Sequence, residues 1–145
     1  MKITSRFTVA VHTLLVIYRF CGQTKTTSES IAASVNVNPV VIRRTLLSLK
    51  AAGIVDVKAG SGGASIIKDL NSITLYDVYR AVDSVDGDLF HFHENPNPTC
   101  PVGKNIHYVL DRHLSDAQKA MEDSLKSVTL AGLAAQLDGN TAIKE

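Results

Sequence analysis

Residues 28–68 read SESIAASVNVNPVVIRRTLLSLKAAGIVDVKAGSGGASIIK, and the first part of this stretch predicts two short helices joined by a sharp turn. Asn36 tolerates the left-handed backbone conformation that a tight corner requires. Asn38 and Pro39 are typical of a helix start, because the asparagine side chain caps the helix and proline already has a helical φ. This is the pattern of a helix-turn-helix, whose second helix enters the major groove of DNA.

The spacing of residues also predicts how these two helices begin and pack. Thr26 and Glu29 have the spacing of a capping box, which predicts the start of the first helix. In the second helix, Ile42, Leu46 and Leu49 recur at helical intervals, so this face is expected to pack inward. The opposite face of the second helix then remains available for DNA.

The rest of the stretch predicts a small hairpin. Residues 54–58 and 64–68 are β-prone, and the glycine-rich residues 59–63 between them suit a hairpin loop. A glycine run can instead cradle a phosphate, but such a loop leads into a helix and ends in Gly-Lys-Ser or Gly-Lys-Thr. Here a second β-prone run follows, so the favoured interpretation is the wing of a winged helix-turn-helix.

Charge divides the chain into two unequal halves. Residues 1–68 hold nine Lys and Arg against two acidic residues, whereas residues 69–145 hold six against twelve. The formal net charge of +1 therefore hides a basic first half, which suits contact with phosphate, and an acidic second half. Charge alone is equally consistent with ordinary solvated surface, but together with the helix-turn-helix and wing it favours DNA.

Length and composition indicate one compact domain with an appended element. The chain has 145 residues, of which 45% are hydrophobic, enough to fill one core. The longest apolar run, residues 7–20, is too short to span a bilayer and lacks a signal-peptide cleavage pattern. It predicts a first helix buried nearly all round, and no membrane partner. Two cysteines far apart predict no disulfide scaffold, so a cytoplasmic location is expected.

Two further helices are predicted after the wing. Residues 74–83 form a short amphipathic pattern, and residues 103–127 form a longer one. The longer helix would span roughly 37 Å at about 1.5 Å per residue, and a small winged helix can cover only part of its apolar stripe. A two-fold homodimer that reads a palindromic operator would cover the rest. Packing of this helix wholly within its own chain is the alternative.

These elements predict a mainly α fold with a small β-wing, built as a winged helix-turn-helix plus a long C-terminal dimerisation helix. The sequence shows no internal repeat or low-complexity tract that would argue otherwise. The expected divisions are a DNA-binding domain with flanking helices (residues 1–83), a sensor or effector loop segment (84–102), and the dimerisation helix with a C-terminal helix (103–138).

Four segments occur in an order that resembles a known family. The opening MKITSR, residues 38–44 (NPVVIRR), residues 60–63 (GSGG) and residues 73–78 (ITLYDV) together resemble the Rrf-two family of bacterial winged-helix transcription regulators. This family includes the iron–sulfur regulator IscR and the nitric-oxide-sensing repressor NsrR. The resemblance implies a homodimer held by the long helix, with the second helix of the helix-turn-helix in the major groove and the wing along the minor groove. The residues expected to contact double-stranded DNA are Lys2, Ser5, Arg6, Asn38, Pro39, Val40, Val41, Arg43, Arg44, Lys58, Gly60, Ser61 and Gly62.

The sequence departs from this family in the segment before the long helix. Members with clusters supply three cysteines there, whereas residues 88–103 contain only Cys100. An iron–sulfur cluster is held mostly by thiolates, so no cluster and no other cofactor is expected. A zinc- or iron-type site is the alternative, because imidazole and thiolate are suitable ligands. Its candidate ligands are His91, His93, Cys100 and His107, although the histidines could equally alternate across a short strand.

Cys100 is the candidate redox sensor. Prolines lie near it on both sides, and a helix is predicted to start just after it. A helix N-terminus lowers the pKa of a thiol, because it stabilises the thiolate. The sequence thus predicts control by thiol oxidation, and a buried or idle cysteine is the alternative.

The function predicted from these features is a sequence-specific DNA-binding transcription regulator, a repressor that acts as a homodimer. The sequence shows no Ser/His/Asp order, no paired carboxylates and no nucleotide fingerprint, so the protein is not expected to be an enzyme. Two alternatives remain: a small-molecule- or metal-responsive regulator, and a winged-helix module that binds protein. The basic first half argues against the second of these.

Overall fold

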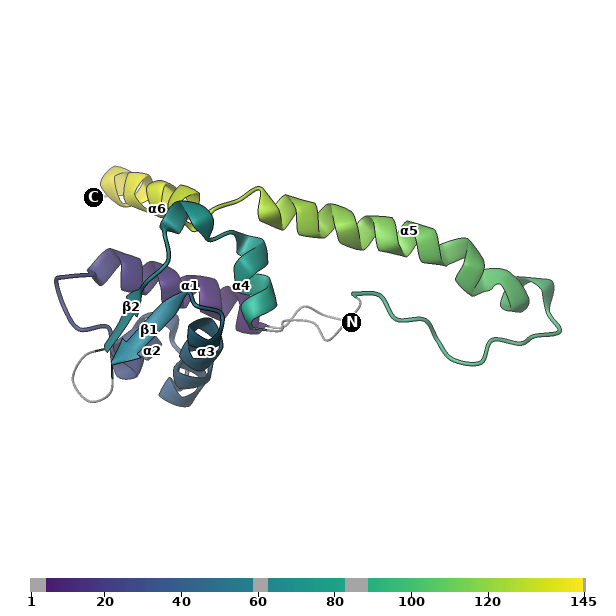
Figure 1. The fold of residues 1–145 in the computed structure, drawn as a ribbon, viewed down its shortest axis with the longest axis horizontal. Helices are drawn as coiled ribbons and strands as arrows, with labels where there is room; N and C mark the ends of the chain where they lie inside the picture. The colour runs from purple at the N-terminus through teal and green to yellow at the C-terminus, as the bar shows by residue number, and fades with distance from the viewer. Residues whose placement is uncertain (1–4, 59–62, 83–88, 145) are drawn as a thin grey trace.

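A computed structural model describes residues 5–58, 63–82 and 89–144, with side chains described up to residue 139. Figure 1 shows a globular part from which one long helix projects. The fold is mainly helical with one two-stranded antiparallel sheet, as predicted. Its elements are α1 (Ser5–Phe20), α2 (Ser28–Val35), α3 (Pro39–Ala51), β1 (Val55–Lys58), β2 (Gly63–Ile66), the 3-10 helix η1 (Leu70–Ser72), α4 (Leu75–Ala81), α5 (Pro101–Lys126) and α6 (Leu130–Lys144).

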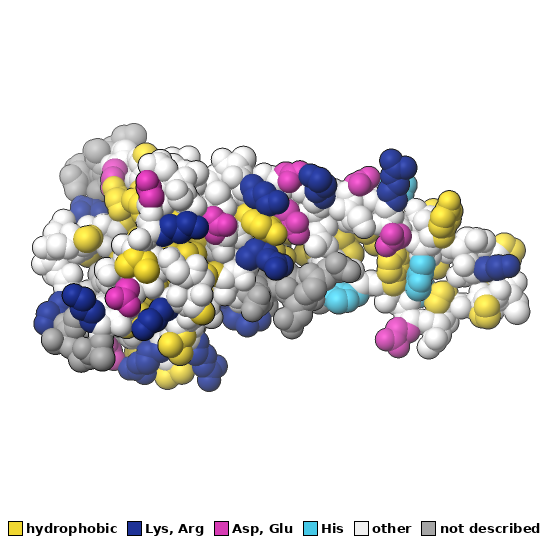
Figure 2. Space-filling model, viewed as in Figure 1, with side chains coloured by type: hydrophobic (Ala, Val, Ile, Leu, Met, Phe, Trp, Pro, Cys, Tyr) yellow, Lys and Arg dark blue, Asp and Glu magenta, His cyan; other side chains and the backbone are white. Residues whose placement is uncertain are grey.

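The projecting helix is α5, and it is held at its C-terminal end. There the backbone N–H of Leu75 donates to Val128 at 2.9 Å, and that of Leu130 donates to Ile73 at 2.7 Å. From this anchor α5 extends over 26 residues, roughly 39 Å, and none of its side chains is buried. Figure 2 shows hydrophobic side chains lying open on this projecting part. Among the described residues, no helix is both long and apolar enough to cross a bilayer.

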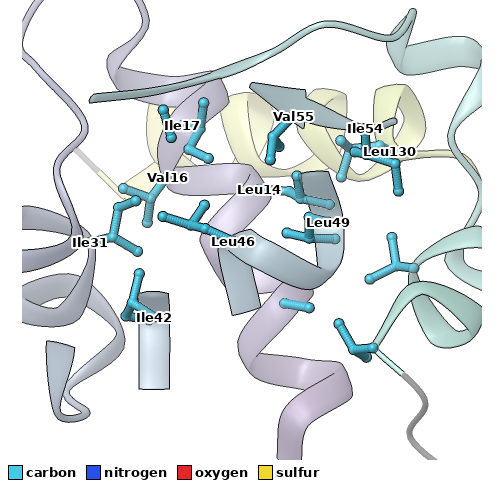
Figure 3. Close-up of a cluster of buried hydrophobic side chains, with 14 of the residues drawn as sticks. Leu14, Val16, Ile17, Ile31, Ile42, Leu46, Leu49, Ile54, Val55 and Leu130 are labelled. Atoms are coloured by element: carbon cyan, nitrogen blue, oxygen red, sulfur yellow. The ribbon is translucent and has the colours of Figure 1, made fainter. Parts of the chain in front are cut away.

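The core lies between α1, α2, α3 and the sheet, and α6 closes it from one side (Figure 3). Leu14, Ile31, Ile42 and Leu49 are fully buried there, and Leu130 of α6 joins the same cluster. Burying such an aliphatic side chain contributes about 1.5–3 kcal/mol, so these five residues favour the folded state of the globular part.

Helix α1 is not buried nearly all round, contrary to prediction. Its buried residues are Ala10, Thr13, Leu14, Val16 and Ile17, which share one side. Other apolar side chains of α1 are only half-buried, because the neighbouring elements of this chain cover one side of the helix. A second apolar surface on α1 is therefore left open.

The helix-turn-helix forms as predicted, except at its first residue. Asn36 has φ +63° at the corner, and the Asn38 side chain accepts a hydrogen bond from the N–H of Val40 at 2.9 Å. The cap of α2, however, is Thr27 and not Thr26, so the predicted capping box is wrong. Thr26 instead donates its hydroxyl to the carbonyl of Ala64 at 2.6 Å, a long-range contact that outweighs the local pattern.

The wing hairpin pairs β1 with β2 from Val55 opposite Ile66 to Lys58 opposite Gly63, so β2 begins one residue earlier and ends two residues earlier than predicted. Gly63 has φ +71°, and a Cβ there would lie 3.0 Å from the carbonyl oxygen of Thr26. Glycine is therefore required for the wing to pack this closely against the segment before α2.

Candidate nucleic-acid interface and sensor segment

Helix α3 has one buried face and one exposed face. Ile42, Leu46 and Leu49 are at most 3% exposed, which confirms the predicted inward face. On the opposite side Val40 is 44% exposed and Leu47 is 67% exposed, although both are apolar. Lys and Arg side chains gather along the lower edge of the globular part in Figure 2, the edge at which α3 lies in Figure 1. This exposed surface of α3 is the part of the structure best suited to meet DNA.

One flank of α3 carries an ion pair. The guanidinium of Arg43 donates to Oε1 of Glu29 in the first turn of α2 at 2.7 Å, and both side chains are more than half exposed. A backbone hydrogen bond at Glu29 and, after it, the Arg43 guanidinium lower the pKa of the Glu29 carboxyl. Arg43, expected to contact DNA, is thus directed toward α2 by Glu29, which the sequence pattern had assigned to a capping box instead.

The other flank of α3 faces the start of α1. A hollow of about 360 Å³ lies between the two helices. It is lined by Ser5, Arg6, Val41, Arg44, Thr45, Ser48 and Val82. The structure therefore brings together four of the predicted DNA-contacting residues, which come from two separate stretches of sequence. Two guanidinium groups beside hydroxyl groups suit a backbone phosphate.

The structure describes only some of the remaining residues that were predicted to contact DNA. Pro39 is the first residue of α3, and the oxygen of the Asn38 side chain is used in the helix cap. Lys58 is exposed at the end of β1, next to the wing loop. Lys2, Gly60, Ser61 and Gly62 lie outside the described residues. Leu47, which sequence reasoning missed, stands seven residues after Val40 and could have been found from that helical spacing.

The segment before α5 is irregular and packs along that helix. The N–H of Leu89 donates to the side-chain oxygen of Gln118 at 2.9 Å, and the ring of Phe92 lies 4.4 Å from that of His107. Gly103 allows this packing, because a Cβ there would lie 2.5 Å from the carbonyl oxygen of Asn97. The alternative of a short strand around the histidines is wrong, since residues 91–93 are coil.

Cys100 is the N-cap of α5 and is half-buried. The backbone N–H groups of Gly103 and, after it, Val102 lie near the start of the helix and lower the pKa of the Cys100 thiol below its ordinary value. The position and the cause are those expected of a helix N-terminus. This thiol is thus more ionised at neutral pH than a thiol without such donors.

The candidate metal ligands are not brought together. The rings of His93 and His107 lie 5.8 Å apart edge to face, and Nε2 of His107 is 3.2 Å from the backbone oxygen of His93. Over the described parts of the chain, no three His, Cys, Asp or Glu side chains form a group that could hold a metal ion. With Cys100 as the one thiol of this segment, the donor set does not fit the thiolate ligation of an iron–sulfur cluster.

An apolar groove lies between α1 and α6, away from α3. Its volume is about 520 Å³, and its apolar lining includes Phe7, Val11 and Leu15 of α1 and Leu133 of α6. The hydroxyl of Tyr18 in α1 donates to Asp138 in α6 at 2.6 Å and joins the two helices. The open side of α1 described above is one wall of this groove.

Comparisons with known proteins agree with this architecture. A family model for Rrf2, described as an iron-dependent transcriptional regulator, matches residues 3–136. YwnA of Bacillus subtilis (strain 168), named provisionally as an HTH-type transcriptional regulator, is 50% identical over 128 residues, or 88% of this chain and 93% of YwnA.

Solved structures show the same fold. A crystal structure of a protein named provisionally as DNA-binding is 44% identical with a TM-score of 0.70, over 89% of this chain and 98% of that one. CymR (YrzC), the global cysteine regulator of B. subtilis, is 20% identical with a TM-score of 0.66, over 94% of this chain and 98% of CymR, and shows the fold alone. The chain therefore belongs to the Rrf2 family, and it is a DNA-binding transcription regulator rather than an enzyme.

Proposed function

We propose that the protein is a homodimeric repressor that binds a palindromic operator and is controlled by oxidation of Cys100. The observation that carries this proposal is the exposure of the side chains of α5. This element is a 26-residue helix without a buried side chain, on which Val102, Tyr108 and Val109 are 69%, 87% and 56% exposed. Exposed apolar surface of this extent is typical of an interface.

The partner surface proposed for α5 is a second copy of the same chain. A two-fold arrangement lets the apolar side chains of each α5 pack against the other α5 and against the open groove between α1 and α6. Both surfaces are apolar, and both remain at least partly exposed in their own chain. Two copies related in this way present two α3 helices, which suits an operator with two inverted half-sites.

Repression follows from occupancy of promoter DNA, and the cytoplasm is the proposed place of action. Release of the protein from its operator is assigned to oxidation of Cys100. Its thiolate attacks one oxygen of a peroxide, so that an S–O bond forms as the O–O bond breaks. The sulfur loses two electrons, a sulfenic acid results, and hydroxide leaves. The added oxygen would disturb the N–H contacts at the start of α5 and so the separation of the two α3 helices.

The assembly is tested by sedimentation of the wild type against Leu114→Asp. Leu114 is half-buried on the apolar stripe, and a carboxylate there would lose its hydration in the dimer without a partner. We expect a dimer for the wild type and a monomer for the variant. Ser115→Asp, at an exposed neighbouring position, is the matched control and should stay dimeric. A wild type that sediments as a monomer at micromolar concentration contradicts the proposal.

Regulation by Cys100 is tested by measuring operator binding before and after treatment with hydrogen peroxide. We expect the oxidant to weaken binding by the wild type and by Cys21→Ser, but not by Cys100→Ser. A serine variant at position 100 that responds like the wild type removes Cys100 as the switch.

A further inference from the structure

The exposed face of α3 combines two apolar side chains with one arginine. Val40, Arg44 and Leu47 are spaced four and three residues apart, so they lie in a row along the helix. Val40 and Leu47 are 44% and 67% exposed, opposite the buried face of Ile42 and Leu49. Nothing else in the described part of the chain covers this row, which therefore holds methyl groups in water on a surface rich in cations.

The first turn of α3 offers methyl groups where a reading helix commonly offers hydrogen bonds. Pro39 has no backbone N–H, and the side-chain oxygen of Asn38 is already used to cap the N–H of Val40. Val40 is the first residue after these two whose side chain is exposed, and it carries only methyl groups at its tip. The N-terminal turn of such a helix is the part that meets base edges in the major groove.

We propose that Val40 recognises thymine through its C5-methyl group. That methyl is the apolar group that the major groove presents, and it distinguishes a T·A pair without a hydrogen bond. The inference rests on the DNA-binding function, and it adds which base is read and by which residue. The partner proposed for this face is duplex DNA, because Arg44 and the flanking Arg6 complement its phosphate charge. Leu47, two turns later, lies too far along the helix to contact the same methyl group.

The test removes single methyl groups from the DNA. Within the region that the wild type protects from cleavage, each thymine is replaced in turn by uracil, which pairs identically but lacks the C5-methyl. Burying one methyl contributes about fourfold in affinity, from roughly 0.8 kcal/mol per buried carbon. We expect one uracil position in a half-site to weaken binding by the wild type about fourfold.

The matching protein variants are Val40→Ala and Leu47→Ala. In Val40→Ala the penalty at that uracil position should fall to nearly none, because its methyl partner is already gone. Leu47→Ala should keep the full penalty at the same position. Both residues are exposed, so thermal unfolding should remain near that of the wild type.

Two outcomes overturn the inference. Either no uracil position weakens wild-type binding, or the penalty persists unchanged in Val40→Ala. Failure of the DNA-binding function gives a different result, namely a wild type that protects no region of duplex DNA.

Discussion

Nη2 of Arg43 lies 2.7 Å from Oε1 of Glu29, which joins the exposed flank of α3 to the first turn of α2. The pair crosses the turn of the helix-turn-helix, and both side chains are solvent-exposed, so it contributes little to stability. The pair instead orients the Arg43 guanidinium, which is held toward a carboxylate of its own chain rather than toward a phosphate.

Replacing Glu29 by glutamine should therefore increase affinity for any duplex, specific or not. Arg43 becomes available to a phosphate, and the log–log dependence of affinity on salt should steepen by about 0.9. Fluorescence anisotropy with an operator and with a random duplex over a salt series measures both. The double variant Glu29→Gln with Arg43→Ala is the control and should lose this steepening. An unchanged salt slope in the single variant would show that Arg43 gains no phosphate contact.

Replacing both Arg43 and Arg44 by alanine should weaken DNA binding and leave the fold intact. Losing the Arg44 phosphate contact lowers the salt slope by about 0.9. Arg43 is paired with Glu29 and should change the slope less, and neither residue lies in the core. Lys119→Ala, which removes one positive charge far along the chain from α3, is the control for an unspecific loss of charge, because Lys119 pairs with Asp123 on α5 at 2.6 Å. Equal affinity of the double variant and the wild type, with normal circular dichroism, would remove both arginines from the interface.

Gly63→Ala should destabilise the protein by on the order of 1–3 kcal/mol, since alanine is strained at φ +71° and its Cβ would press on the Thr26 carbonyl. The substitution Gly139→Ala should have the opposite effect and stabilise the protein. Gly139 lies in α6 with nothing within 4 Å of an added Cβ, so alanine should stabilise the helix by about 0.5–1 kcal/mol. Urea unfolding measures both changes. An unchanged free energy of unfolding in Gly63→Ala would mean that the wing shifts easily away from the Thr26 carbonyl.

Alkylation of Cys100 should depend on pH with a midpoint below that of an ordinary thiol. The N–H groups of Gly103 and Val102 stabilise the thiolate and lower its pKa. The reactive thiolate of the folded protein therefore forms at a lower pH than an ordinary thiolate does. Iodoacetamide rates on Cys21→Ser isolate this thiol. The same variant in urea loses the helix end, and its midpoint should move to higher pH. Coincident folded and unfolded profiles would contradict the effect of the N–H groups.

Sequence patterns predicted the helix-turn-helix and the wing because their signals are local. The corner at Asn36 and the cap at Asn38 depend on residues within one turn, and both are confirmed. The start of α2 was placed one residue too early because Thr26 has a second use, the hydrogen bond to Ala64. That partner lies 38 residues away, beyond the reach of any capping rule.

The candidate site was predicted residue by residue but not as an arrangement. The proximity of Arg6 to Arg44 depends on how α1 crosses α3, and the pairing of Arg43 with Glu29 depends on the angle between two helices. Neither follows from the period of one helix. The open side of α1 was missed for a related reason, since an apolar run does not show whether its cover comes from the same chain or from another.

The backbone pairing of residues 73–75 with residues 128–130 has a consequence for the order of folding. Leu130 is 1% exposed and completes the core that α1 and α3 begin. During synthesis the ribosome must release all of α5 before Leu130 can reach that core. The DNA-reading helices therefore complete their packing only after the whole projecting arm exists, and a nascent chain truncated at residue 83 would lack part of its own interior.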